Sequence, residues 1–155
     1  MKKVLIRSAQ LEDAQSVFEV HKNSVENLCT GDYGPEQIAM WLNGRSPATY
    51  REAIAAGNLW LAYTDRLQGF IEIDGNEISK LFVRGAAAGQ GIGARLLNEA
   101  LQRIKNAGHT KACLEATLNA EMFYAAFGFE KVGEGTFSRG NSPVSIEIIK
   151  MELAL

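Results

Sequence analysis

Residues 81–97 read LFVRGAAAGQGIGARLL, in which an apolar strand pattern passes through a glycine-rich loop into an amphipathic helix pattern. Glycines in such a loop let the backbone approach an anion, and the amide groups at a helix start favour negative charge. No Lys followed by Ser or Thr closes the loop, which disfavours a P-loop. Leu96 stands where a dinucleotide fingerprint starting at Gly91 needs its third glycine. A phosphate site and a close-packed structural turn are the two remaining interpretations.

The segments on either side of this stretch follow strand and helix periodicities. A strand, a crossover helix and a second strand imply a parallel pair between 77–83 and 111–116. Asp74-Gly75 predicts a hairpin turn, and Asn119 is a natural N-cap for a short helix that ends at Gly128. We expect strands over 3–7, 59–63, 69–73, 77–83, 111–116, 129–137 and 144–153, with helices starting near 14, 35, 47, 94 and 119. This order predicts a mixed α/β sheet with helices on both faces.

Two of these strands carry a more detailed pattern. In 144–153 the apolar phase changes between Ile148 and Ile149, which predicts either a bulge or burial on both faces. Alternation along 77–83 predicts one face that carries Glu77, Ser79, Leu81 and Val83.

Composition limits the class of protein. The 155 residues are 46% hydrophobic and 22% charged, which fits a single domain over 1–155. Sixteen basic and eighteen acidic residues leave no basic field for nucleic acid or a membrane surface. No apolar run reaches the roughly 20 residues of a membrane span, and Arg7 precedes any signal-like stretch, so we expect a cytoplasmic protein. Two cysteines and two histidines lie too far apart in sequence to predict a metal site.

Several short motifs accompany the element order: Leu81-Phe82-Val83, Gly89-Gln90-Gly91-Ile92-Gly93-Ala94, Leu96-Leu97, Asn119, Phe123-Tyr124 and Phe127-Gly128-Phe129. With these motifs the chain resembles the GNAT-type N-acetyltransferase superfamily over nearly its whole length, and in particular small bacterial members of unassigned acceptor. The resemblance implies a mostly antiparallel central sheet with helices on both faces and a parallel pair flanking the cofactor cleft.

The resemblance also implies an acetyl-CoA site. Loop amides would hold the pyrophosphate, the preceding strand would pair with the pantetheine arm, and Asn119 and Tyr124 would lie near the arm and thioester. The implied cofactor-binding residues are Phe82, Val83, Gly89, Gln90, Gly91, Ile92, Gly93, Ala94 and Asn119. Ala88 stands where the family usually has Gln or Arg, and Gly85 replaces its usual Pro. From these departures we expect a more flexible start of the loop and weaker acetyl-CoA binding.

Acetyl transfer to an amine needs a proton acceptor, an oxyanion donor and an acid for the departing thiolate. Glu77 matches the position where several family members carry a carboxylate base, although a solvated hairpin residue is the structural alternative. Tyr124 is the implied general acid, with a core tyrosine as the alternative. The backbone N–H of Val83 is the implied oxyanion donor.

The acceptor pocket would lie between the first two helices and the strand ends. Its candidate residues are His21, Ser24, Tyr33 and Trp41, each of which could instead be a packing residue. Glu72 and Asp74 add negative charge near the base, which favours a cationic acceptor.

These observations together predict direct transfer of acetyl from acetyl-CoA to the primary amine of a small molecule, in a ternary complex and without a covalent enzyme intermediate. A non-catalytic acyl-CoA binding or sensing module is the alternative outside the enzyme class. Protein or peptide N-acetylation is the alternative within it. The apolar residues of the final hairpin permit a homodimer.

Overall fold

The computed structural model describes residues 3–155, and its strands form one sheet in the order β1-β2-β3-β4-β5-β7-β6. The parallel pair is β4–β5, and the other neighbours are antiparallel. The strands are β1 (Leu5–Ser8), β2 (Leu59–Tyr63), β3 (Leu67–Asp74), β4 (Glu77–Val83), β5 (Lys111–Thr117), β6 (Glu130–Phe137) and β7 (Ile146–Ala154). Both the strands and the parallel pair expected from the sequence are confirmed.

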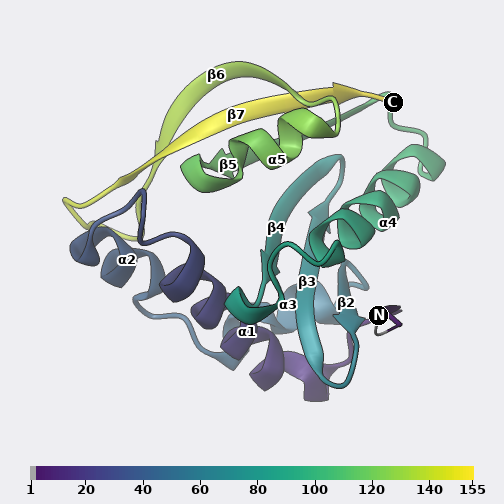
Figure 1. Cartoon of the computed structure of the whole chain (residues 1–155), viewed down its shortest axis with the longest axis horizontal. Helices are drawn as coiled ribbons and strands as arrows, with labels where there is room; N and C mark the ends of the chain where they lie inside the picture. Colours follow the sequence, from purple (N-terminus) through teal and green to yellow (C-terminus); the bar gives the residue numbers. More distant parts are fainter. Residues whose placement is uncertain (1–2) are drawn as a thin grey trace.

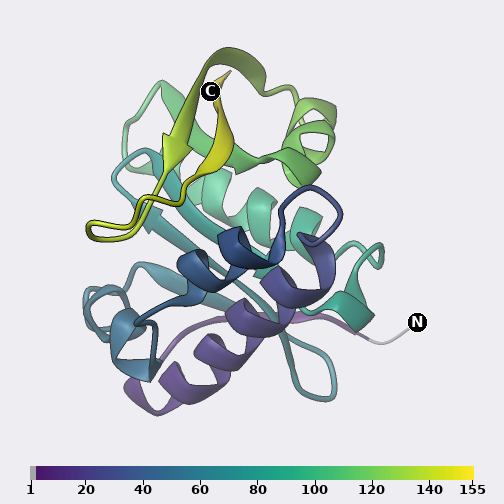
Figure 2. The same ribbon diagram turned by 90° about the vertical axis from the view of Figure 1, so that its left-hand side faces the viewer.

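Helices cover both faces of this sheet (Figure 1). They are α1 (Ala14–Leu28), α2 (Pro35–Leu42), α3 (Arg51–Ala55), α4 (Ile92–Asn106) and α5 (Glu121–Ala126), with the 3-10 turns η1 (Leu11–Asp13), η2 (Pro47–Tyr50), η3 (Gly85–Ala87) and η4 (Leu118–Ala120). Figure 2 shows α1 and α2 in front of the sheet and α4 behind it. No helix over residues 3–155 is long and apolar enough to cross a membrane.

Three clusters of buried side chains, one on one face and two on the other, show why the sheet is covered on both faces. One packs α4 and α5 against inward residues such as Ile71, Ile78 and Leu114. The other side of the sheet packs against α1, α2 and α3, with Phe82 contributing to this side. In β7, Ile148 joins the α1–α2 side and Ile149 joins the α4–α5 side, so burial on both faces explains the phase change.

The expected alternation along β4 is wrong at Ser79. Ile73 pairs with Ile78, whereas Glu72 pairs with Lys80, so Ser79 is an extra residue in β4. A bulge of this kind reverses the side on which the following residues lie. Ile78 therefore packs in the same cluster as Leu81.

The expected N-cap at Asn119 is also wrong. Asn119 lies inside η4, and the N-cap residues of η4 and α5 are Thr117 and Ala120. The chain leaves β5 through this 3-10 turn before the α-helix begins, so the capping position moves away from Asn119. Asn119 is left to face the opening between β4 and β5.

The parallel pair is short. β4 and β5 are in register at Glu77 with Cys113 and at Ile78 with Leu114, next to the β3–β4 turn. The turn itself uses Gly75 and Asn76, and Cys113 N–H donates to Asn76 O at 3.0 Å. Beyond Ile78 the bulged β4 is no longer in register with β5, so the edge of β4 at the half-buried residues Leu81, Phe82 and Val83 is unpaired on the β5 side, while β4 remains paired with β3.

The start of the glycine loop forms a 3-10 turn that contacts α1. Residues 85–87 form η3, and Gly85 N–H donates to Asn23 Oδ1 of α1 at 2.9 Å. Proline could not donate this hydrogen bond. A Cβ at residue 85 would lie 2.7 Å from Asn27 Cβ, so the close approach of α1 requires glycine. Glycine at position 85, where the family usually has proline, is thus explained by its contacts with Asn23 and Asn27 of α1.

This contact predicts that Gly85→Ala lowers the free energy of unfolding by about 1–3 kcal/mol, because α1 and the loop must separate to admit the methyl group. Gly31→Ala is the matched control, since a Cβ at Gly31 meets nothing within 4 Å and its backbone is outside the left-handed region. We expect the control to leave the stability unchanged or raise it by about 0.5 kcal/mol. Urea unfolding of both variants measures the difference, and equal midpoints would contradict the proposed close contact.

Candidate active site

Two pockets meet where β4 and β5 separate. The glycine-loop pocket, of about 580 Å³, lies between β4, the loop, the start of α4 and α5. The β-face pocket, of about 240 Å³, lies between α1, the end of α2, β4, β5 and β7. Both are lined by Leu81, Phe82, Thr117, Ala120 and Tyr124. A group bound in one pocket can therefore reach a group bound in the other.

The glycine-loop pocket collects most of the predicted cofactor-binding residues. It is lined by Phe82, Val83, Gly89, Gly91, Ile92, Gly93, Ala94 and Asn119. Gln90 instead lines a neighbouring open pocket of about 1050 Å³, together with Arg66 and with Gly89 and Gly91, which both pockets share. The loop thus lies between the glycine-loop pocket and a wider pocket whose lining includes the charged residue Arg66.

The backbone of the loop suits an anion. Gly89 and Gly91 have φ of +77° and +80°, a conformation that favours glycine, and added Cβ atoms would meet nothing within 4 Å. Gly91 is the N-cap of α4, no side chain caps this helix, and its first turn holds no acidic residue. The first amide groups of the 15-residue α4 are therefore left for a ligand, as a phosphate or pyrophosphate requires.

The N–H of Val83 faces the opening. Arg84 N–H donates to Gln68 O on β3 at 2.8 Å. Successive N–H groups along a strand point to opposite edges, so Val83 N–H points away from β3, toward the side where β5 has separated. The donor that the resemblance implied is thus directed into the region where the pockets meet.

Tyr124 of α5 lines both pockets at their junction. Its ring packs against Phe123 and Phe129, with centroid distances of 5.2 and 5.7 Å. Burial raises the pKa of the Tyr124 phenol well above its usual value near 10, so the hydroxyl keeps its proton at neutral pH.

Glu77 lies half-buried at the start of β4 and lines neither of the two pockets. Burial raises the pKa of Glu77, and the charges of Glu115 and Asp74 raise it further. Glu115 on β5 does line the β-face pocket, and the sequence reasoning missed it. Alternation along β5 could have found it, because Glu115 lies two positions from Cys113, the register partner of Glu77.

His21 and Trp41 line the β-face pocket as expected. The His21 ring stacks on Phe82 with a centroid distance of 4.0 Å, and its Nδ1 lies 2.7 Å from Tyr50 Oη. Burial, followed by the charges of Arg45, Lys80 and Arg139, holds the pKa of His21 well below its usual value, so the imidazole is neutral. Among the residues that the structure describes, its buried Nε2 has no hydrogen-bond partner.

The other two candidates for the acceptor pocket lie elsewhere. Ser24 lines the glycine-loop pocket. Tyr33 lines neither pocket, because its hydroxyl donates to Glu147 O at 2.6 Å and accepts from Leu118 N–H at 3.0 Å. Through these two hydrogen bonds, Tyr33 links the segment before α2 to β7 and η4.

A thiol also lies in the glycine-loop pocket. Cys29, at the C-terminal end of α1, is buried and free, and Cys113 is a second free thiol on β5. Burial, followed by the charge of Asp32, raises the pKa of Cys29 to about 12. Over residues 3–155 no group of three or more His, Cys, Asp or Glu side chains is placed to hold a metal ion.

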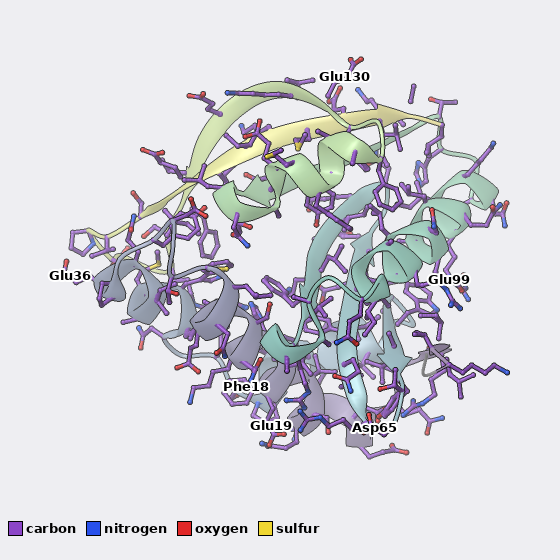
Figure 3. All side chains as sticks on the ribbon, viewed as in Figure 1. Phe18, Glu19, Glu36, Asp65, Glu99 and Glu130 are labelled. Carbon is purple, nitrogen blue, oxygen red and sulfur yellow. The ribbon has the colours of Figure 1, made fainter. Side chains whose placement is uncertain are left out.

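The charges around the β-face pocket differ from the sequence expectation. Glu72 is buried and its carboxylate is bound by Lys80 at 2.6 Å and by Ser79 at 2.7 Å, so its charge is neutralised within the protein. Figure 3 shows Glu36, Glu99 and Glu130 on the outside of the molecule. The expectation of a negatively charged acceptor site, based on Glu72 and Asp74, is therefore not supported at Glu72.

The site thus consists of a pocket beside a glycine loop and a smaller pocket that shares five lining residues with it. The family model described as acetyltransferase (GNAT) domain matches residues 29–155. The chain therefore belongs to the GNAT acetyltransferase family.

Solved structures share the fold. A GCN5-related N-acetyltransferase from Rhodopseudomonas palustris is 22% identical with a TM-score of 0.93, covering 100% of this chain and 98% of that one. PaiA N-acetyltransferase from Thermoplasma acidophilum, solved with coenzyme A, is 23% identical with a TM-score of 0.75 and 99% coverage of both chains. YncA from Salmonella typhimurium, solved with its cofactor acetyl-CoA, is 14% identical with a TM-score of 0.73, covering 98% and 94%.

Proposed function

We propose that the protein transfers acetyl from acetyl-CoA to the primary amine of a small molecule while both substrates are bound. The meeting of the two pockets at Tyr124 carries this proposal, because it lets an amine in one pocket reach a thioester in the other. The small volume of the β-face pocket, about 240 Å³, favours a small acceptor over a peptide.

Acetyl-CoA would occupy the glycine-loop pocket. The amide groups at Gly89, Gly91 and the first turn of α4 would bind the pyrophosphate, and Arg66 lies beside the loop in the wider pocket that would take the adenosine phosphate. The unpaired edge of β4 at Phe82 and Val83 would hydrogen-bond the pantetheine arm. This arrangement directs the thioester toward Tyr124.

The chemical step needs two proton transfers. The bound ammonium loses its first proton to Glu77 through water, because Glu77 does not itself line the pocket. The amine nitrogen then forms a bond to the thioester carbon, and Val83 N–H donates to the oxyanion. When the C–S bond breaks, sulfur takes the proton of Tyr124, and the second proton of the nitrogen restores the phenol. The products are an amide, free CoA and one proton released from Glu77.

Acetyl-CoA should stabilise the folded protein if the glycine loop is its site. At about 100 times its Kd, the ligand adds roughly 2.7 kcal/mol, or a rise of about 5–10 °C in the unfolding temperature. Thermal unfolding with acetyl-CoA and with CoA measures this rise, and ATP at the same concentration is the control. An unchanged unfolding temperature at millimolar acetyl-CoA would contradict the proposed site.

Tyr124→Phe distinguishes an enzyme from a binding or sensing module. We expect kcat to fall about 10²-fold or more, because the phenol that protonates the thiolate is lost, while acetyl-CoA still stabilises the variant. Tyr63→Phe on β2, outside both pockets, is the matched control and should keep the wild-type kcat. The rates of both variants are measured from the release of the CoA thiol. Full activity of Tyr124→Phe would exclude the phenol as the acid.

The raised pKa of Glu77 predicts a pH dependence. A base must be ionised, so kcat/KM should fall as the pH drops through the pKa of Glu77, at a pH above the usual glutamate range. Glu77→Gln should lower kcat/KM by about 10²-fold and remove the fall at low pH. The control Glu130→Gln, on the outer strand β6, should keep the wild-type kcat/KM and the wild-type fall at low pH. Rates measured across pH test this, and an unaltered acidic limb in Glu77→Gln would assign the proton to another group.

A further inference from the structure

The β-face pocket has walls of different charge. One wall comes from α1, the end of α2 and the turn after it, and it carries His21, Trp41 and Arg45. The wall formed by β5 and α5 carries Glu115, Thr117 and Tyr124. A ligand that spans the pocket therefore meets a guanidinium at one end and, at the other, a carboxylate near the proposed site of transfer.

Arg45 makes no direct ion pair with a carboxylate of the described residues, and the charge of Glu72, which is bound to Lys80, acts on it only from beyond contact distance. Its side chain is half-buried, and its Nε donates to Trp41 O at 3.0 Å. Within residues 3–155, no Asp or Glu oxygen lies within 4.0 Å of its guanidinium nitrogens. Leaving a partly desolvated cation unpaired is unfavourable, so an anion supplied by a ligand would be bound strongly here.

A second guanidinium reinforces this charge. Arg139, from the β6–β7 hairpin, donates from Nε to Asn43 O at 2.8 Å, which places it beside the turn that carries Arg45. Burial lowers the pKa of Arg45, and the nearby charge of Arg139 lowers it too. Lys80 also faces the pocket, but its charge is taken by Glu72 at 2.6 Å. The unmatched positive charge is thus concentrated at the Arg45 end.

The neutral groups at this end extend the anion site. Tyr50 Oη lies 2.7 Å from His21 Nδ1. When the phenol donates to Nδ1, the neutral His21 ring carries its proton on Nε2. This Nε2–H is a buried donor that no described residue accepts, and it belongs to a side chain that lines the β-face pocket.

Building on the proposed acetyl transfer, we propose that the acceptor is a small amino acid whose carboxylate binds Arg45 beside His21. Its ammonium group would lie toward Glu115 and Tyr124, where the acetyl group is delivered. Guanidinium binds a carboxylate through two parallel N–H donors, which a neutral amide cannot match. A phosphonate offers similar oxygens but a larger head, so the pocket of about 240 Å³ favours the carboxylate.

The test compares amines that differ at the proposed anionic end. Initial rates of thiol release from acetyl-CoA are measured with the standard L-amino acids, their primary amides and the corresponding aminoalkylphosphonates. We expect at least one free acid to exceed its amide by about ten- to a hundredfold in kcat/KM. Arg45→Gln should bring this ratio toward one, and Arg45→Lys should retain part of it. Arg51→Gln on α3, exposed and outside the pocket, is the matched control for the ratio.

Each other outcome rejects the inference. Amides accepted as well as acids, a ratio unchanged in Arg45→Gln, or a preference for phosphonates would each exclude a carboxylate at Arg45. Absence of turnover with every free acid would exclude it as well. Acetyl-CoA stabilisation in the same samples separates these results from failure of the proposed function, which would show no rise in unfolding temperature.

Discussion

The early end of pairing between β4 and β5 is the constraint on which the site depends. A continuous sheet would satisfy the edge of β4 with β5, and neither the Val83 N–H nor the junction of the two pockets would be accessible. Pairing is instead restricted to Glu77 and Ile78, next to the β3–β4 turn, and the bulge at Ser79 follows at once. The fold therefore leaves the backbone N–H of Val83 without a partner strand on that edge, where a ligand can accept from it.

Short loops and tight packing hold this opening in place. Tyr33 links the segment before α2 to both β7 and the chain after β5, and Gly85 joins the glycine loop to Asn23 of α1. These contacts come from opposite sides of the separated strands. The opening is thus bounded by structure that does not itself take part in the reaction, as a preorganised site requires.

Much of the fold followed from local patterns, because each strand and helix is specified by its own periodicity. The bulge did not, since the consecutive polar residues Ser79 and Lys80 interrupt the alternation but do not show that an extra residue is present or which one it is. Asn119 was misplaced for a related reason: a 3-10 turn and an α-helix start accept the same capping residues. The residue preferences of this segment indicated that a helix is present but did not determine its first residue.

The site was predictable where a motif carried it, and also at His21 and Trp41, which were expected between the first two helices and the strand ends. The glycine loop and Tyr124 lie in contiguous motifs, and the structure brings them together. Arg45 and Glu115 come from a turn and a strand 70 residues apart, and in the sequence each is an ordinary surface-type charge. Whether these two charges are available to a ligand depends on which neighbouring charges are already paired. The pairing of Glu72 with Lys80 is a tertiary contact that the sequence does not show. The spacing of residues along the sequence therefore could not predict which charges around the pocket remain unpaired.

Cys29 illustrates how the same burial protects the chemistry. A thiolate beside a thioester would exchange with it and trap the acetyl group on the protein. Because burial raises the pKa of Cys29 to about 12, the thiol keeps its proton at neutral pH. A thioester bound in the glycine-loop pocket, as proposed above, would therefore meet a protonated sulfur and stay available to the amine.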